Sequence, residues 1–117
     1  MNLYHCMITL KSDAKALAFA SAAEHWLNGL QGRGLINGWQ LFRRKLGLAS
    51  GHHSDVILLI DVEDMAQLET AFQTLANDAI DTDQRHFALV HEMIAEVDIG
   101  LYRPYPDASN RERVALI

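Results

Sequence analysis

The chain starts with a segment in which strongly apolar residues alternate with less apolar ones. One side of Asn2–Leu10 carries Tyr4, Cys6, Ile8 and Leu10, and the other side carries Leu3, His5, Met7 and Thr9. A period of two residues predicts a β-strand with one clearly apolar face and one mixed face.

A helical pattern follows the first strand. Apolar residues recur every three or four positions over Leu17–Leu30, and two glycines, Gly32 and Gly34, come directly after them. Ser12 and Asp13 precede the pattern and carry side-chain oxygens that suit the N-cap of a helix. We therefore expect a helix that begins near these two residues and ends at the glycines.

Two extended segments come next, Ile36–Leu46 and Asp55–Val62. Gly47, Ser50 and Gly51 lie between them and supply residues typical of turns. The two segments therefore predict a long β-hairpin.

A second helix is predicted from Asp64, because Gln67 follows three residues later as in a capping box and apolar residues continue at helical spacing to Leu75. Polar residues interrupt the pattern between positions 77 and 83. Asp81 and Gln84 form a second capping pattern, which predicts that a short helix continues after the interruption.

A last strand is predicted over residues 95–102, where apolar and polar residues alternate again. Pro104 and Pro106 end it. The pattern thus describes one domain over residues 1–106. The tail, residues 107–117, is polar and then apolar, and we expect it to be either frayed or docked on a partner subunit.

The predicted order is β-α-β-β-α-β, which is the pattern of a ferredoxin-like α+β domain. In this fold the four strands form an antiparallel sheet of order 4-1-3-2, and the helices cover one face of it. The third strand, however, is apolar on both sides: Val56, Leu58 and Ile60 on one, Ile57 and Leu59 on the other. We therefore expect a homodimer that buries the helix-free face. The alternative is a monomer with an exposed apolar patch, which is uncommon.

Composition and charge limit the kinds of partner and the cellular location that we expect. The chain has 117 residues, half of them hydrophobic, and its 10 basic and 15 acidic residues give a net charge of -5. This charge does not suit a nucleic-acid partner. A single cysteine, Cys6, allows no internal disulfide, and neither a signal peptide nor a membrane-spanning run is evident. We expect a cytoplasmic protein without membrane partners.

Three stretches of the sequence resemble a known family. They are GWQLFRRKLGL (Gly38–Leu48), VILLIDVEDMAQLETAF (Val56–Phe72) and GLYRPYPD (Gly100–Asp107), and they are similar to a small bacterial family of unknown function within the dimeric α+β barrel superfamily. The resemblance implies a ferredoxin-like fold paired into a dimeric barrel. The superfamily includes antibiotic-biosynthesis monooxygenases, haem-degrading oxygenases and muconolactone isomerases, so fold alone does not select an activity. No motif residue transfers from a characterised enzyme.

The residues themselves suggest a candidate site between the paired sheets. Strand alternation places His5 and Asp98 on the helix-free face, and a histidine beside a carboxylate is a suitable general base. Four polar residues are assigned to ligand binding: Gln40, Arg44, Glu96 and Tyr102. For Gln40 and Arg44 both faces of the second strand stay open, because the other face carries Arg43 and Lys45 beside Trp39. The alternative is that these groups form a satisfied polar network at the dimer interface.

Two functions follow from this site. The first is a binding or structural module that holds a small ligand between the sheets, in a cavity shared by two chains. The second is a cofactor-independent monooxygenase or isomerase that acts on a small aromatic or carboxylated molecule, with His5 as general base. We expect no metal, because the adjacent His52 and His53 point to opposite faces of a strand and His91 has alanine, Ala95, four residues later. We also expect no cofactor, because the glycines at 29, 32 and 34 end a helix, whereas phosphate-binding glycines open one.

Overall fold

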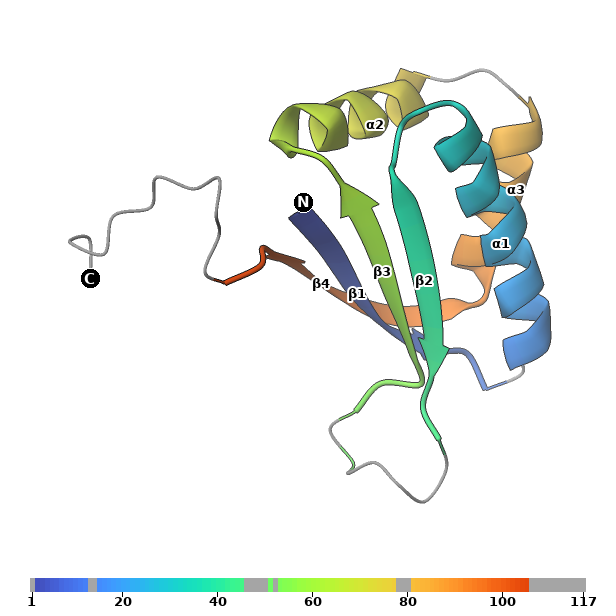
Figure 1. Ribbon diagram of the computed structural model, residues 1–117. Helices are drawn as coiled ribbons and strands as arrows, with labels where there is room; N and C mark the ends of the chain where they lie inside the picture. Colours follow the sequence, from blue (N-terminus) through green and yellow to red (C-terminus); the bar gives the residue numbers. More distant parts are fainter. Residues whose placement is uncertain (1, 13–14, 46–50, 52, 78–80, 106–117) are drawn as a thin grey trace.

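A computed structural model describes residues 2–12, 15–45, 51, 53–77 and 81–105. Its elements follow the predicted order, with the second helical region divided into two helices (Figure 1). In chain order they are β1 Asn2–Leu10, α1 Ala16–Gly32, β2 Gly38–Arg43, β3 Val56–Val62, α2 Met65–Asn77, α3 Asp81–Glu92 and β4 Ile94–Tyr102. The tail assigned to residues 107–117 lies outside the described residues.

The four strands form one antiparallel sheet of order β2-β3-β1-β4, which confirms the predicted order 4-1-3-2. Figure 1 shows α1 and α3 side by side on one face of this sheet and α2 across one end of it. The three helices all lie on the same side. We call the opposite surface of the described sheet the open face.

Helix α1 begins later than the sequence predicts. Its first residue is Ala16, and Lys15 occupies the N-cap position without a side-chain hydrogen bond. Ser12 is therefore not the cap, and Asp13 lies outside the described residues. The predicted end is confirmed: Gly34 adopts a φ of 74°, and the Leu35 amide donates to the Leu30 carbonyl oxygen at 3.0 Å. A left-handed residue here suits glycine, which has no Cβ.

Helix α2 begins as the capping pattern predicts. The Gln67 amide donates to Asp64 Oδ1 at 2.8 Å, and Gln67 Oε1 accepts from the Glu63 amide at 2.6 Å. These two bonds satisfy amides that have no partner within the helix. They also fix the point at which the chain leaves β3 and crosses the end of the sheet.

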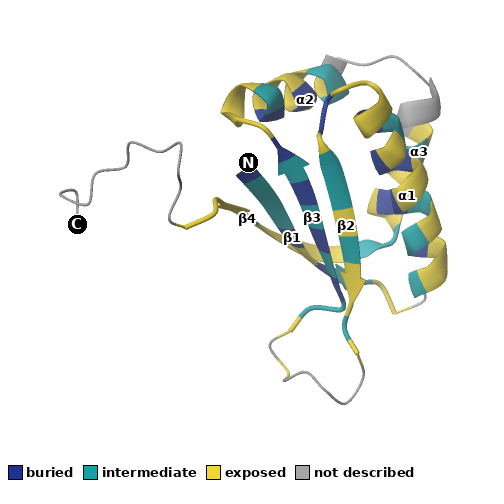
Figure 2. Cartoon of the chain, in the orientation of Figure 1, coloured by how far each residue is buried: buried dark blue, intermediate teal, exposed yellow. Residues whose placement is uncertain are grey.

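The core lies between the sheet and the helices (Figure 2). Every second residue of β3, from Val56 to Val62, is buried there, and Phe19 and Leu27 of α1 have no exposed surface. The intervening β3 residues Ile57 and Leu59 lie on the open face and are only half-buried. The prediction that β3 is apolar on both sides is thus confirmed, and one chain covers only one of them.

Candidate functional site

The strand register places most of the predicted site residues on the open face. Cross-strand partners share a face, and His5 lies opposite Gly100 of β4, with Leu3 opposite Tyr102. The His5 and Tyr102 rings meet edge to face, with centroids 5.3 Å apart. Gly100 makes this possible, because a Cβ there would lie 3.2 Å from Cε2 of the Tyr102 ring.

The two predicted carboxylates lie on the same face but are not hydrogen-bonded to the histidine. Asp98 is opposite Met7, and Glu96 is opposite Thr9. Asp98 is therefore a diagonal neighbour of His5, and Glu96 lies one pair further along. No hydrogen bond joins either carboxylate to His5 within the described part of the chain. The role of His5 and Asp98 as a catalytic pair stays a prediction.

The predicted ligand-binding residues on β2 lie farther away. Gln40 is opposite Leu59, which is itself opposite His5. Gln40 therefore lies two strands away from the histidine, a total of about 10 Å. Arg44 lies beyond the end of β2, where Nη2 is 3.5 Å from Oδ1 of Asp55. Asp55 Oδ2 in turn accepts a hydrogen bond from the Leu10 amide at 3.1 Å.

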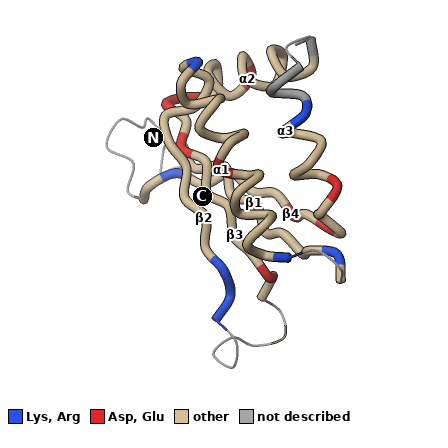
Figure 3. The backbone as a smooth tube through the Cα atoms, turned by 90° about the vertical axis from the view of Figure 1, so that its right-hand side faces the viewer, with Lys and Arg blue, Asp and Glu red and all other residues tan. Residues whose placement is uncertain are grey.

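Arg44 is thus held at the hairpin end of the sheet. Figure 3 shows the basic run that contains it, Arg43 to Lys45, at the end of β2. The structure brings His5 and Tyr102 into contact, keeps Glu96 and Asp98 on the same face, and leaves Gln40 and Arg44 apart from them.

A hollow lies on the other side of the sheet, beneath the helices. A cavity of about 320 Å³, partly open to solvent, lies between β1, β3, β4 and the three helices. Four of its lining side chains carry a nitrogen, oxygen or sulfur atom, and all the others are aliphatic or phenylalanine; the four are Tyr4, Cys6, Trp26 and His91. We call this space the helix-side cavity. The expectation that a cavity would have to be shared between two chains is wrong for this one.

The sequence contained one signal for this cavity. Val97 and Ile99 of β4 share the face of Ile8 and Cys6, so their alternation predicted burial beneath the helices. In the structure they line the cavity and remain 43% and 56% exposed. The apolar side of the sheet is therefore wider than the layer of helices that packs on it.

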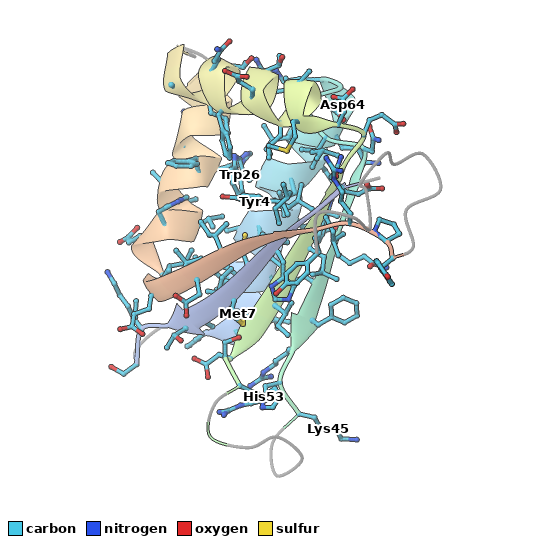
Figure 4. All side chains as sticks on the ribbon, turned by 90° about the vertical axis from the view of Figure 1, so that its left-hand side faces the viewer. Tyr4, Met7, Trp26, Lys45, His53 and Asp64 are labelled. Atoms are coloured by element: carbon cyan, nitrogen blue, oxygen red, sulfur yellow. The ribbon has the colours of Figure 1, made fainter. Side chains whose placement is uncertain are left out.

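The polar groups of the cavity are uncharged or hydrogen-bonded locally. Burial raises the pKa of the Cys6 thiol to about 11. The pKa of Tyr4 is also raised, mainly by burial and secondly by its electrostatic interaction with Cys6. His91 Nδ1 donates to the Phe87 carbonyl oxygen at 3.0 Å, and its ring stacks on Phe87 with centroids 3.8 Å apart. Trp26 Nε1 is buried and has no hydrogen-bond partner among the described residues. Figure 4 shows Trp26 and Tyr4 beneath α2.

The raised pKa of Cys6 leads to a prediction about its reactivity. We expect iodoacetamide to alkylate Cys6 in the folded protein at pH 8 at least about 100-fold more slowly than in urea, because only the thiolate reacts and burial disfavours it. The protonated thiol favours folding below its ordinary pKa of about 8.5, and this contribution is lost as the pH rises towards 11. Mass spectrometry of timed samples measures the rates; equal rates in the two states would contradict the buried placement.

Within the described residues, His, Cys, Asp and Glu side chains form no group of three or more that could bind a metal ion. None of the described helices is both long enough and apolar enough to cross a bilayer.

Solved structures with the same fold share little sequence with this chain. A NIPSNAP family protein of unknown function from Agrobacterium tumefaciens has a TM-score of 0.66 at 14% identity, over 89% of this chain and 87% of that one. A dimeric ferredoxin-like protein of unknown function from Jannaschia sp. CCS1 has a TM-score of 0.61 at 14% identity, over 89% and 100%. A protein described as an antibiotic biosynthesis monooxygenase has a TM-score of 0.61 at 13% identity, over 91% and 100%.

These similarities establish the ferredoxin-like fold. No curated protein sequence matches the chain significantly. The model of the family of unknown function DUF6614 matches residues 1–117, and the chain therefore belongs to that family.

Proposed function

We propose that the protein is a homodimer in which each subunit binds one small, uncharged, mainly apolar molecule in the helix-side cavity. The observation that carries this proposal is the cavity itself. Its volume of about 320 Å³ falls within the range of small-molecule pockets, roughly 300–1,000 Å³, and its lining is almost entirely apolar. Left empty, this hollow would expose an apolar lining that includes Phe72, Val97 and Ile99 to water.

The chemistry of the lining restricts the ligand. An ionised group in the cavity would lose part of its hydration without gaining a fixed opposite charge, because among the described lining residues only His91 is basic. Tyr4 and Cys6 stay protonated at neutral pH, since burial raises both pKa values. The cavity therefore favours a neutral molecule.

The open face supports the dimer. Phe42 is 49% exposed and Met7 38% exposed, and Ile57 and Leu59 beside them are half-buried. Asp61, on the same face, has a buried Oδ1 with no hydrogen-bond partner within the described chain. A second copy seated on this face would cover these apolar residues. The structurally similar Jannaschia protein is described as dimeric.

Indane, an uncharged bicyclic hydrocarbon, tests the cavity without any need to know the natural ligand. We expect it to bind one molecule per subunit and to shift the methyl NMR signals of cavity residues such as Leu68 and Ile99. The variant Ala71→Leu should abolish this binding, because Ala71 is buried on α2 and lines the cavity. The added side chain fills the void, so the thermal stability of the variant should stay equal or rise.

Ala66→Leu is the matched control. Ala66 lies on the same helix, is exposed and does not line the cavity, so this variant should bind indane as the wild type does. The proposal fails if indane does not bind the wild type, or if Ala71→Leu binds it unchanged.

The catalytic alternative assigns His5 as general base of an oxygenase or isomerase. The contact of His5 with Tyr102 favours it, since a histidine and a phenol side by side can bind and deprotonate a small substrate. Our account expects His5→Ala to weaken the dimer and to leave indane affinity within about twofold of wild type, because His5 is on the opposite side of the sheet from the cavity. Analytical ultracentrifugation and the indane titration measure both. An intact dimer that has lost ligand binding would support the catalytic alternative.

A further inference from the structure

The two tryptophans of the chain differ in their hydrogen bonding. Trp39 Nε1 donates to Asn28 Oδ1 at 2.9 Å. Trp26 is 8% exposed, its Nε1 is buried, and it makes no hydrogen bond to any described residue. Buried donors in native proteins nearly always have a partner, so an unpaired one calls for an explanation.

The position of Trp26 supplies that explanation. Its side chain lines the helix-side cavity, and its ring meets Phe87 and His91 edge to face, with centroids 5.4 Å and 6.2 Å apart. These contacts hold the indole between α1 and α3. The other described side chains around the cavity are nearly all apolar, so they provide few hydrogen-bond acceptors for this N–H group.

We infer that Trp26 Nε1 is the polar anchor of the bound molecule, which therefore carries one neutral oxygen acceptor, a ketone, ether or phenol oxygen, on an aromatic or alicyclic body. The inference rests on the proposed function. An indole N–H is a donor only, so it selects an acceptor. A carboxylate would also accept, but the apolar lining disfavours its charge.

The matched pair indane and 1-indanone tests the inference, because the two differ mainly by one carbonyl oxygen. In wild-type protein, 1-indanone should move the indole N–H signal of Trp26 downfield, and indane should not. The indole signal of Trp39 serves as an internal control, since its N–H is already bonded to Asn28. This measurement requires no variant.

Trp26→Phe removes the donor and keeps an aromatic ring. We expect it to weaken 1-indanone binding about tenfold, the effect of losing one buried hydrogen bond, and to change indane binding by less than about twofold. Trp39→Phe should change neither affinity.

The outcomes separate the inference from the proposed function. If indane and 1-indanone both fail to bind the wild type, the proposed function and the inference both fail. If both bind but 1-indanone leaves the Trp26 signal unmoved, or Trp26→Phe weakens both equally, the cavity is a ligand site and the inference is overturned. If Trp26→Phe does not fold, the wild-type indole signals decide.

Discussion

Leu59→Asp is expected to convert the dimer into a folded monomer. Leu59 lies at the middle of the central strand β3 with its side chain on the open face, between Gln40 and His5 in the cross-strand register. A pair of subunits would have to bury one unpaired carboxylate from each. Such groups cost several kcal/mol each, so the dissociation constant should rise by about 1,000-fold or more.

Sedimentation equilibrium measures the change, and circular dichroism checks that the fold is kept. Leu17→Asp is the matched control, because Leu17 is 85% exposed on α1 and lies on the helix side of the sheet. It should leave the dimer intact. A wild-type protein that is monomeric at micromolar concentration, or a Leu59→Asp variant that dimerises normally, would show that the open face is not the interface.

Phe19→Ala is expected to lower the free energy of unfolding by about 3–5 kcal/mol, the usual cost of truncating a buried aromatic residue. Phe19 has no exposed surface and is among the largest fully buried side chains. It does not line the helix-side cavity, so the loss would come from packing alone. For a domain of this size the melting temperature should fall by about 10–20 °C.

Urea denaturation of the wild type and the variant at the same protein concentration measures the loss, since dimerisation makes stability depend on concentration. Leu17→Ala, two positions earlier on the same helix, should change the free energy of unfolding by less than about 0.5 kcal/mol because its side chain is exposed. A loss below 1 kcal/mol for Phe19→Ala would contradict the packing of α1 on the sheet.

The fold could be predicted because its signals are local. The alternation in Asn2–Leu10, the capping pattern of Asp64 with Gln67 and the glycines after Leu30 each identify one element, and their order allows few topologies. The start of α1 was misjudged. Ser12 has a suitable oxygen, but the chain needs further residues to turn from β1, so the helix begins at Ala16 with an N-cap lysine that cannot accept a bond.

The candidate site was predicted only in part, because strand alternation fixes the face of a residue and not its neighbours. It placed His5 and Tyr102 together on the open face, but it did not show that Arg44 lies beyond the strand beside Asp55. The helix-side cavity depends on how closely three helices pack on a sheet. The spacing of Leu68, Val90 and Trp26 along the sequence is the same whether the space between their side chains is filled or empty. The sequence pattern therefore does not reveal a cavity.

Strand β1 connects the two proposed surfaces. Its residues Tyr4 and Cys6 line the cavity, whereas His5 and Met7, between and after them, lie on the open face. The proposed ligand binding and dimer formation would therefore involve opposite sides of one strand. A cavity within each subunit would allow a chain of 117 residues to bind the proposed ligand without a site shared between two sheets.

A crystal structure of the wild-type protein grown with 1-indanone tests the central claim most directly. Our account predicts two copies paired through their open faces, with one molecule of 1-indanone in each helix-side cavity, against Ala71 and Trp26. An empty cavity, or 1-indanone bound between the paired sheets beside His5, would contradict it.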